Sequence, residues 1–98
     1  MDPFVLKQKL IAILSQIQAD SGLECPALTG ATKPIGTIPK FDSKVWPVAI
    51  TNLAVEISAP IPNDVNIFFD EMTKQPRSID ETVAFVCGLL KKTEAAAA

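Results

Sequence analysis

The sequence has no histidine and only two cysteines, Cys25 and Cys87, which lie far apart and form no CxxC motif. Zinc sites and base-activated nucleophiles commonly use histidine, so its absence argues against both. We expect no metal ion and two free thiols in a reducing compartment. There is no GxGxxG motif, and neither Gly30 nor Gly36 opens a phosphate-binding loop with a following Lys-Ser/Thr pair.

The chain also lacks a long apolar run, a signal peptide pattern and a basic cluster. No apolar segment has the length of a membrane span, and the net charge is −2 with scattered lysines. We therefore expect a cytoplasmic protein with no membrane span and no nucleic-acid partner. The 98 residues predict a single domain, 1–98, with a disordered tail at about 93–98.

Candidate pairs of carboxylates include the adjacent residues Asp70-Glu71 and Asp80-Glu81. Neighbouring side chains on a helix point in different directions, so these pairs are poorly placed for general acid/base catalysis. The cysteines have no histidine to activate them. We expect that the protein is not an enzyme.

What is present is a helical pattern. A first helix is predicted at about 3–20, with Asp2 and Pro3 at its start, Gly22 just past its end, and Gln16 and Gln18 mostly off its apolar face. The apolar residues at helical spacing are Leu6, Leu10, Ile13, Leu14 and Ile17. Residues 22–41 form a long connection interrupted by proline and glycine, which apolar side chains can attach to the helices.

A second helix follows Asp42-Ser43, and Pro47 means that it starts with a distorted turn or a residue or two later. Its core face comprises Trp46, Ala49, Ile50, Leu53 and Ile57. A second apolar stripe carries Val45, Val48 and Val55. A helix that is apolar on two sides is either deeply buried or presents one side to a partner.

Two further helices complete the prediction. A short third helix is expected at about 64–72, and a fourth at about 79–92. The fourth starts at a capping box, Ser78-Ile79-Asp80-Glu81, and its core face carries Ile79, Val83, Val86 and Leu90. No strand pattern with regular alternation is found. The predicted fold is all-α, a small four-helix bundle with three main helices and a short third one.

The dipeptide Asp42-Ser43 allows two interpretations. Asp and Ser are favoured helix caps, so the pair could simply start the second helix. Ser43 has no base nearby and is a poor nucleophile by itself, but another enzyme could modify its hydroxyl. A helix start offers N–H groups to a phosphate, and Lys40 and Lys44 flank the pair with positive charge.

The order of these features resembles the acyl carrier and peptidyl carrier protein family. Members of that family have a helix, a long loop, and an Asp-Ser pair at the start of the second helix. An Ile-Pro element then precedes a short third helix and a fourth. Here Phe41-Asp42-Ser43 fits the attachment motif, and Pro62, preceded by Ile61, lies nineteen positions after Ser43. The similarity covers nearly the whole chain.

The resemblance implies a function. Ser43 would carry 4′-phosphopantetheine, with Asp42 and Lys44 beside the attachment point, and the arm would hold an acyl or aminoacyl group as a thioester. The implied partners are a phosphopantetheinyl transferase, a loading ligase and a downstream synthase or transferase. Partner binding is expected at Val45, Trp46, Val48 and Val55, and self-association through the second helix is an alternative use of that surface.

The chain also departs from the family pattern. Lys44 replaces the usual apolar residue after the serine, Ser58 replaces the usual glycine at the end of the second helix, and residues 73–77 are extra. Glu56 is the only carboxylate of the second helix, which favours apolar docking over charge-guided docking. These departures leave open a second function, a carrier-like protein-binding module without the prosthetic group.

Overall fold

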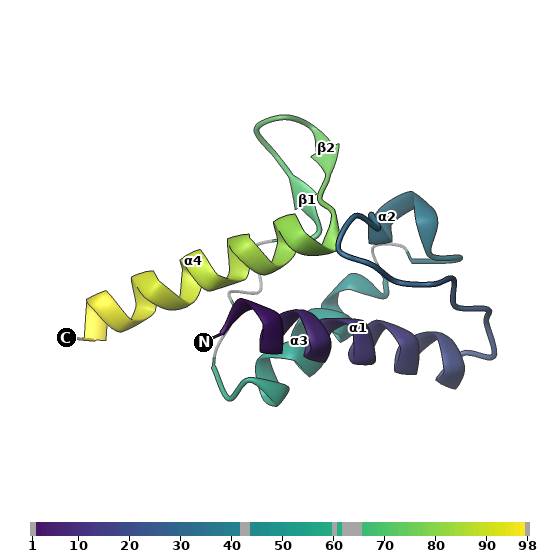
Figure 1. Ribbon diagram of the computed structural model, residues 1–98, viewed down its shortest axis with the longest axis horizontal. Coiled ribbons are helices and arrows are strands. Elements are labelled where there is room, and N and C mark those ends of the chain that lie inside the picture. The colour runs from purple at the N-terminus through teal and green to yellow at the C-terminus, as the bar shows by residue number, and fades with distance from the viewer. Residues whose placement is uncertain (1, 42–43, 60, 62–65, 98) are drawn as a thin grey trace.

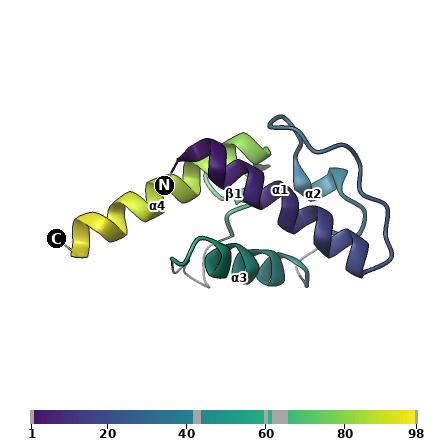
Figure 2. The same cartoon turned by 60° about the horizontal axis from the view of Figure 1, so that its bottom comes forward.

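The computed structural model describes residues 2–41, 44–59, 61 and 66–97, with side chains as far as Lys91. The chain is mostly helical, with a small two-stranded sheet. Its elements are α1 (Pro3–Asp20), α2 (Pro34–Thr37), α3 (Trp46–Glu56), β1 (Phe69–Asp70), β2 (Gln75–Pro76) and α4 (Ile79–Ala97). Both α3 and α4 pack on α1 and run antiparallel to it (Figures 1 and 2).

The predicted bounds of α1 are confirmed, and local chemistry explains both ends. Asp2 is the N-cap, and its carboxylate accepts the Phe4 N–H at 2.8 Å. At the other end Gly22 has φ +68°, its N–H donates to the Ala19 carbonyl, and the Leu23 N–H donates to the Gln18 carbonyl. This is a Schellman motif, which needs the left-handed conformation that glycine adopts without strain.

Gln18 corrects the sequence prediction, because it lies on the buried face of α1. The core residues Leu6, Leu10 and Leu14 recur every four positions, and Gln18 is the next in that row, with 2 % of its surface exposed. Its amide nitrogen donates to the Glu24 carbonyl at 3.0 Å and to the Pro39 carbonyl at 3.1 Å. One side chain therefore fixes both ends of the long connection to α1.

The core face of α3 is confirmed. Ala49, Ile50, Leu53 and Ile57 are buried, and Trp46 is half-buried against the same cluster. From the long connection, Ile38 and Phe41 join the core, as expected for a loop that apolar side chains hold in place. Within that connection α2 is a single turn in which Ile35 and Gly36 leave helical dihedral angles.

The capping box of α4 is confirmed. The Glu81 carboxylate accepts the Ser78 N–H at 3.0 Å, and the Ser78 hydroxyl accepts the Glu81 N–H at 3.1 Å. The predicted core residues Ile79, Val83, Val86 and Leu90 are all buried. The helix continues to Ala97, five residues past the predicted end at 92.

The long connection supplies hydrogen-bond acceptors for the first N–H groups of α4. The Ile79 N–H donates to the Thr32 carbonyl at 2.8 Å, and the Asp80 N–H donates to the Gly30 carbonyl at 2.9 Å. Gly30 is buried beneath the Asp80 side chain, and a Cβ at position 30 would overlap that carboxylate. Lys7 of α1 pairs with Asp80 at 3.3 Å, so α1, the connection and α4 meet at one point.

The predicted third helix at 64–72 is wrong over its described part. Residues 62–65 lie outside the described residues, while Phe69 and Asp70 form β1, paired antiparallel with β2. The Asp70 carboxylate accepts the N–H groups of Met72 and Thr73, which closes the turn between the strands. The expectation that the chain contains no strand is therefore also wrong.

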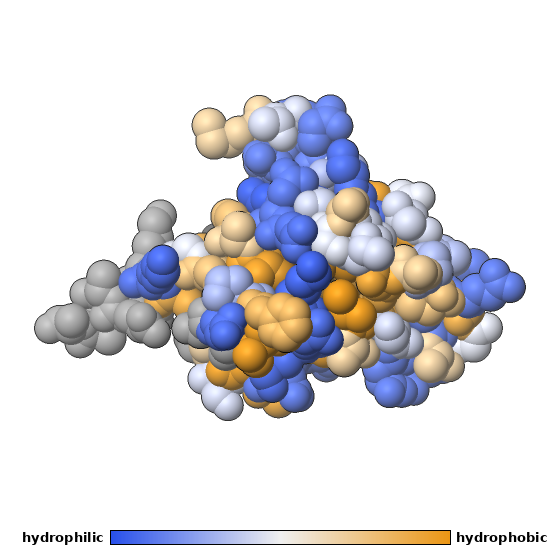
Figure 3. Space-filling view, viewed as in Figure 1, coloured by the Kyte–Doolittle hydropathy of each residue, from blue (hydrophilic) through white to orange (hydrophobic). Residues whose placement is uncertain are grey.

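Arg77 contacts residues before the hairpin, within it and after it. Its Nη1 donates to the carbonyls of Asn66, Ile67 and Phe69 at 3.0–3.4 Å. Its guanidinium also lies 3.9 Å from the centre of the Phe85 ring of α4. The hairpin projects from the helices as a mainly hydrophilic feature, while apolar side chains appear on the helical body below it (Figures 1 and 3).

Candidate functional site

The predicted attachment pair, Asp42 and Ser43, lies outside the described residues, and its neighbours on both sides contact the core. Phe41 is 5 % exposed, and its ring meets the Phe68 ring edge to face with centroids 5.0 Å apart. On the other side the Trp46 indole N–H donates to the Phe41 carbonyl at 3.3 Å. The chain is thus fixed to the domain immediately before the pair and again three residues after it.

The start of α3 comes later than the cap interpretation requires. The N-cap is Val45, with φ −89° and ψ −32° and no side-chain capping bond, and Pro47 lies in the first turn. The interpretation in which Ser43 is the cap therefore places the helix start too early. The delay agrees with the expected effect of Pro47, which cannot donate a backbone hydrogen bond.

Charged residues flank the pair on both sides. Lys40 and Lys44 are exposed on either side of it. The first turn of α3 contains no acidic residue, so no carboxylate there opposes an anion near the positive end of the helix dipole. Lys40 and Lys44 are thus the described charged residues that flank the pair, while the pair itself lies outside the described residues.

The four predicted partner residues divide into two pairs. Val48 and Val55 are 49 % and 72 % exposed, whereas Val45 and Trp46 are half-buried against the core. We call the exposed side of α3, formed by Val48, Thr51, Asn52 and Val55, the outer face of α3. It carries no charged residue, which distinguishes it from an acidic docking helix.

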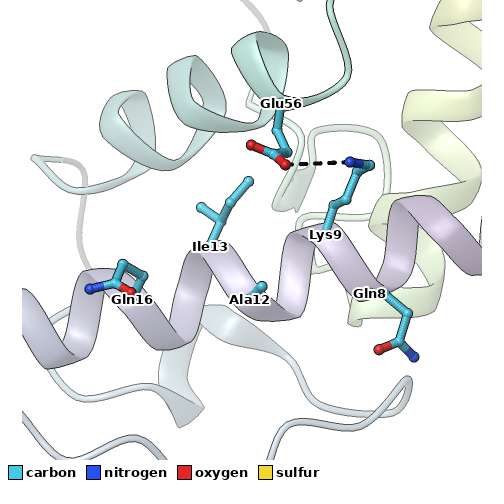
Figure 4. A pocket seen from close by; sticks show the side chains of 6 residues that line it. All are labelled: Gln8, Lys9, Ala12, Ile13, Gln16 and Glu56. Atoms are coloured by element: carbon cyan, nitrogen blue, oxygen red, sulfur yellow. Dashed lines mark hydrogen bonds and ion pairs between the residues drawn. The ribbon is translucent and has the colours of Figure 1, made fainter.

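A groove that the sequence did not indicate lies between α1 and α3. Its volume is about 400 Å³, and its lining residues are Gln8, Lys9, Ala12, Ile13, Gln16 and Glu56. Figure 4 shows Ile13 pointing toward α3, with Lys9 and Glu56 meeting across the groove, where Lys9 Nζ lies 3.4 Å from Glu56 Oε1. These two residues are far apart in the chain, so only packing of the helices reveals their pairing.

Among the described residues, the groups with shifted pKa values belong to turns and caps. The N–H groups of Met72 and Thr73 lower the pKa of Asp70. The N–H of Ser78, followed by its hydroxyl, lowers the pKa of Glu81. In both cases hydrogen bonds to the ionised form explain the shift, so a catalytic role is not needed to account for it.

The thiols and the acidic residues form no further site within the described ranges. Cys25 is exposed and Cys87 is half-buried, and both are free thiols. No group of three or more His, Cys, Asp or Glu residues that could hold a metal ion occurs in this part of the chain. No described helix combines the length and apolar character needed to cross a membrane.

Three comparisons were made with known proteins: with models of protein families, with curated sequences and with solved structures. None of the three returned a match.

Proposed function

We propose that this chain is a carrier protein that holds an acyl or aminoacyl group as a thioester on 4′-phosphopantetheine attached to Ser43. The observation that carries the proposal is the pair of anchors around the Asp-Ser dipeptide. Phe41 is buried before it, and Trp46 bonds back to the Phe41 carbonyl after it. A short segment fixed at both ends, at the start of a helix, is a suitable place for a modifying enzyme to engage a serine hydroxyl.

The core positions support the same proposal. The carrier resemblance implies core positions at Ala49, Ile50, Leu53, Ile57 and Ile61. Here α3 and α4 both pack on α1, and the core positions Ala49, Ile50, Leu53, Ile57 and Ile61 are all buried. The hairpin at 69–76 is a departure, since its first strand occupies residues expected in a short helix and its second strand lies in the extra residues 73–77.

Intact-mass measurement tests the attachment. The protein is co-produced with several phosphopantetheinyl transferases of different specificity. We expect a mass increase of one phosphopantetheine, which Ser43→Ala abolishes. Ser21→Ala is the matched control, because Ser21 is exposed at the end of α1, and it should be modified like the wild type. Failure of every transferase to modify the wild-type protein would contradict the proposal.

We further propose that partner enzymes dock on the outer face of α3. Its uncharged, partly apolar surface suits burial in an apolar partner patch. Val48→Asp places a charge at its centre, whereas Val5→Asp places the same charge on α1, where Val5 is 41 % exposed. We expect Val48→Asp to slow modification or loading with little change in stability, and Val5→Asp to leave both near the wild-type level.

A second candidate function is a protein-binding module without the prosthetic group. Lys44 favours it, because a charged, exposed residue follows the serine where the carrier pattern has an apolar contact. The mass measurement separates the two functions. If no transferase modifies the protein and Val48→Asp still abolishes binding to a partner, the module is the better account.

A further inference from the structure

The long connection between α1 and α3 is closed into a loop by one side chain. The Gln18 amide nitrogen donates to the carbonyls of Glu24 and Pro39, so two backbone groups far apart in the chain meet at one atom. Ile38, next to Pro39, is 4 % exposed and belongs to the core. A surface loop whose ends lie close together has the form of an Ω-loop. We call Glu24, Ile38 and Pro39 the neck, and residues 25–37 between them the flap.

A second set of contacts, which we call the latch, holds the flap on the start of α4. The Ile79 N–H donates to the Thr32 carbonyl at 2.8 Å, and the Asp80 N–H donates to the Gly30 carbonyl at 2.9 Å. The Asp80 side chain lies over Gly30, and Lys7 of α1 holds its carboxylate at 3.3 Å. Figure 1 shows the connection passing from the end of α1 to the start of α4. The neck therefore joins the connection to α1, whereas the latch joins it to α4.

The flap buries less of its surface than the segment that follows it. Gly30 and Pro34 are its buried residues, and Leu28 and Ile35 are half-buried against the core. The rest of the flap is half-buried or exposed. Segments with few buried apolar contacts open at a lower free energy than the core. The latch therefore supplies much of what keeps the flap closed.

We propose that the flap opens as a unit, with the latch released and the neck still closed on Gln18. The opening frees the first N–H groups of α4 and uncovers the side of β2 on which α2 packs. The contacts of α1 with α3 and α4 stay in place. Phe41 and Trp46, which anchor the chain beside the candidate serine, lie outside the flap and keep their bond. The device is therefore independent of the carrier proposal.

Labelling of single buried thiols with a chromogenic aryl disulfide tests the opening in the full chain. Cys25→Ser and Cys87→Ala remove the two native thiols. Three buried reporters are then added one at a time: Pro34→Cys in the flap, Ile38→Cys in the neck and Val86→Cys in α4. A buried thiol reacts only when the chain opens around it. The flap thiol should react fastest and depend least on urea, because its opening exposes little surface.

Gly88→Ala separates opening of the flap from unfolding of α4. Gly88 is exposed within α4, and a Cβ there would meet no atom within 4 Å, so alanine stabilises the helix. Where closing is faster than labelling, the thiols at positions 38 and 86 should react about fivefold more slowly. The thiol at position 34 should react at an unchanged rate, because α4 stays folded when the flap opens. Equal slowing at all three positions would overturn the proposal.

Gly30→Ala tests the latch itself. The added Cβ overlaps the Asp80 carboxylate only while the flap is closed. Labelling at position 34 should therefore become about tenfold faster or more. An unchanged rate there would show that the contact between Gly30 and Asp80 survives the opening, which would contradict release of the latch. An Ile38→Cys thiol that reacts as fast as the Pro34→Cys thiol would show that the neck opens too, and would also overturn the proposal.

Discussion

Replacing Gln18 tests whether one buried amide holds the long connection to α1. Gln18→Leu keeps most of the side-chain volume but removes both donors, to the Glu24 and Pro39 carbonyls at 3.0 and 3.1 Å. A hydrogen bond contributes about 1 kcal/mol net, and a buried group left unpaired costs about 1–3 kcal/mol. Glu24 and Pro39 are themselves exposed, so water can partly replace the lost donors. We therefore expect a loss of about 1 kcal/mol for each of the two bonds, about 2 kcal/mol in total.

Urea unfolding at neutral pH, followed by far-ultraviolet circular dichroism, measures this loss. A destabilisation of this size should lower the thermal midpoint by about 8–16 °C in a domain of this length. Gln16→Leu is the matched control, because Gln16 is exposed and bonds to Asp20 on the exposed side of the same helix. It should cost less than about 0.5 kcal/mol. A Gln18→Leu variant as stable as the Gln16→Leu variant would refute the reasoning.

Gln18→Glu adds a pH test of the same site. The carboxylate would be buried and would face two carbonyl oxygens, so the pKa of the introduced group should rise above its ordinary value near 4.3. The folded state then binds the proton more tightly than the unfolded state. Stability relative to the wild type should fall as the pH rises through the interval between these two pKa values, and the full loss should be present at neutral pH. A pH-independent difference would place the side chain in solvent.

Three further predictions concern the backbone and the start of α4. Ser58 has φ +54° just after α3, so Ser58→Gly should raise the free energy of unfolding by about 0.5–1 kcal/mol in urea titrations; a loss would contradict the left-handed conformation. Gly30→Ala should cost about 1–3 kcal/mol through overlap with the Asp80 side chain, and less in an Asp80→Ala background when a double-mutant cycle is measured. Bonds from Ser78 lower the pKa of Glu81, so the ionised Glu81 stabilises the folded state at neutral pH, and this stabilisation is lost as the pH falls through the folded-state pKa. Glu81→Gln should therefore make the free energy of unfolding depend less on pH in the acid range, as urea titrations at several pH values would show.

The features that local chemistry determines were predictable from the sequence. Asp2 and Gly22 mark both ends of α1, and the Ser78–Glu81 pair marks the start of α4. The spacing of apolar residues also identified the core faces of the three long helices. In each case the signal lies within a few residues of the structure that it predicts.

The hairpin and the role of Gln18 were not predicted, because distant contacts determine them. The apolar content of 64–72 suited a short helix, and nothing local indicated that Arg77 would bond to three carbonyls of the preceding segment. Gln18 could have been noticed as the next member of the four-residue row after Leu14. A polar residue in that row is informative only once its partners, the carbonyls at 24 and 39, are known.

The position of the candidate site was predicted from the sequence, whereas the contacts of the residues beside it are known only from the structure. Asp42-Ser43 was chosen from its order and spacing along the chain. The bond from the Trp46 indole to the Phe41 carbonyl spans five positions and has no signature in the sequence. The exposed valines of α3 were predicted as one stripe with Val45, but Val45 is partly covered by the core.

The bonds from the start of α4 to the Thr32 and Gly30 carbonyls have a consequence for hydrogen exchange. The amides of Ile79 and Asp80 belong to a helix by position, but their acceptors belong to a segment almost fifty residues earlier. Their exchange with deuterium therefore reports the opening of the long connection rather than the fraying of α4. If the connection detaches in a sub-global event, these two amides lose protection together, ahead of the amides in the middle of the helix.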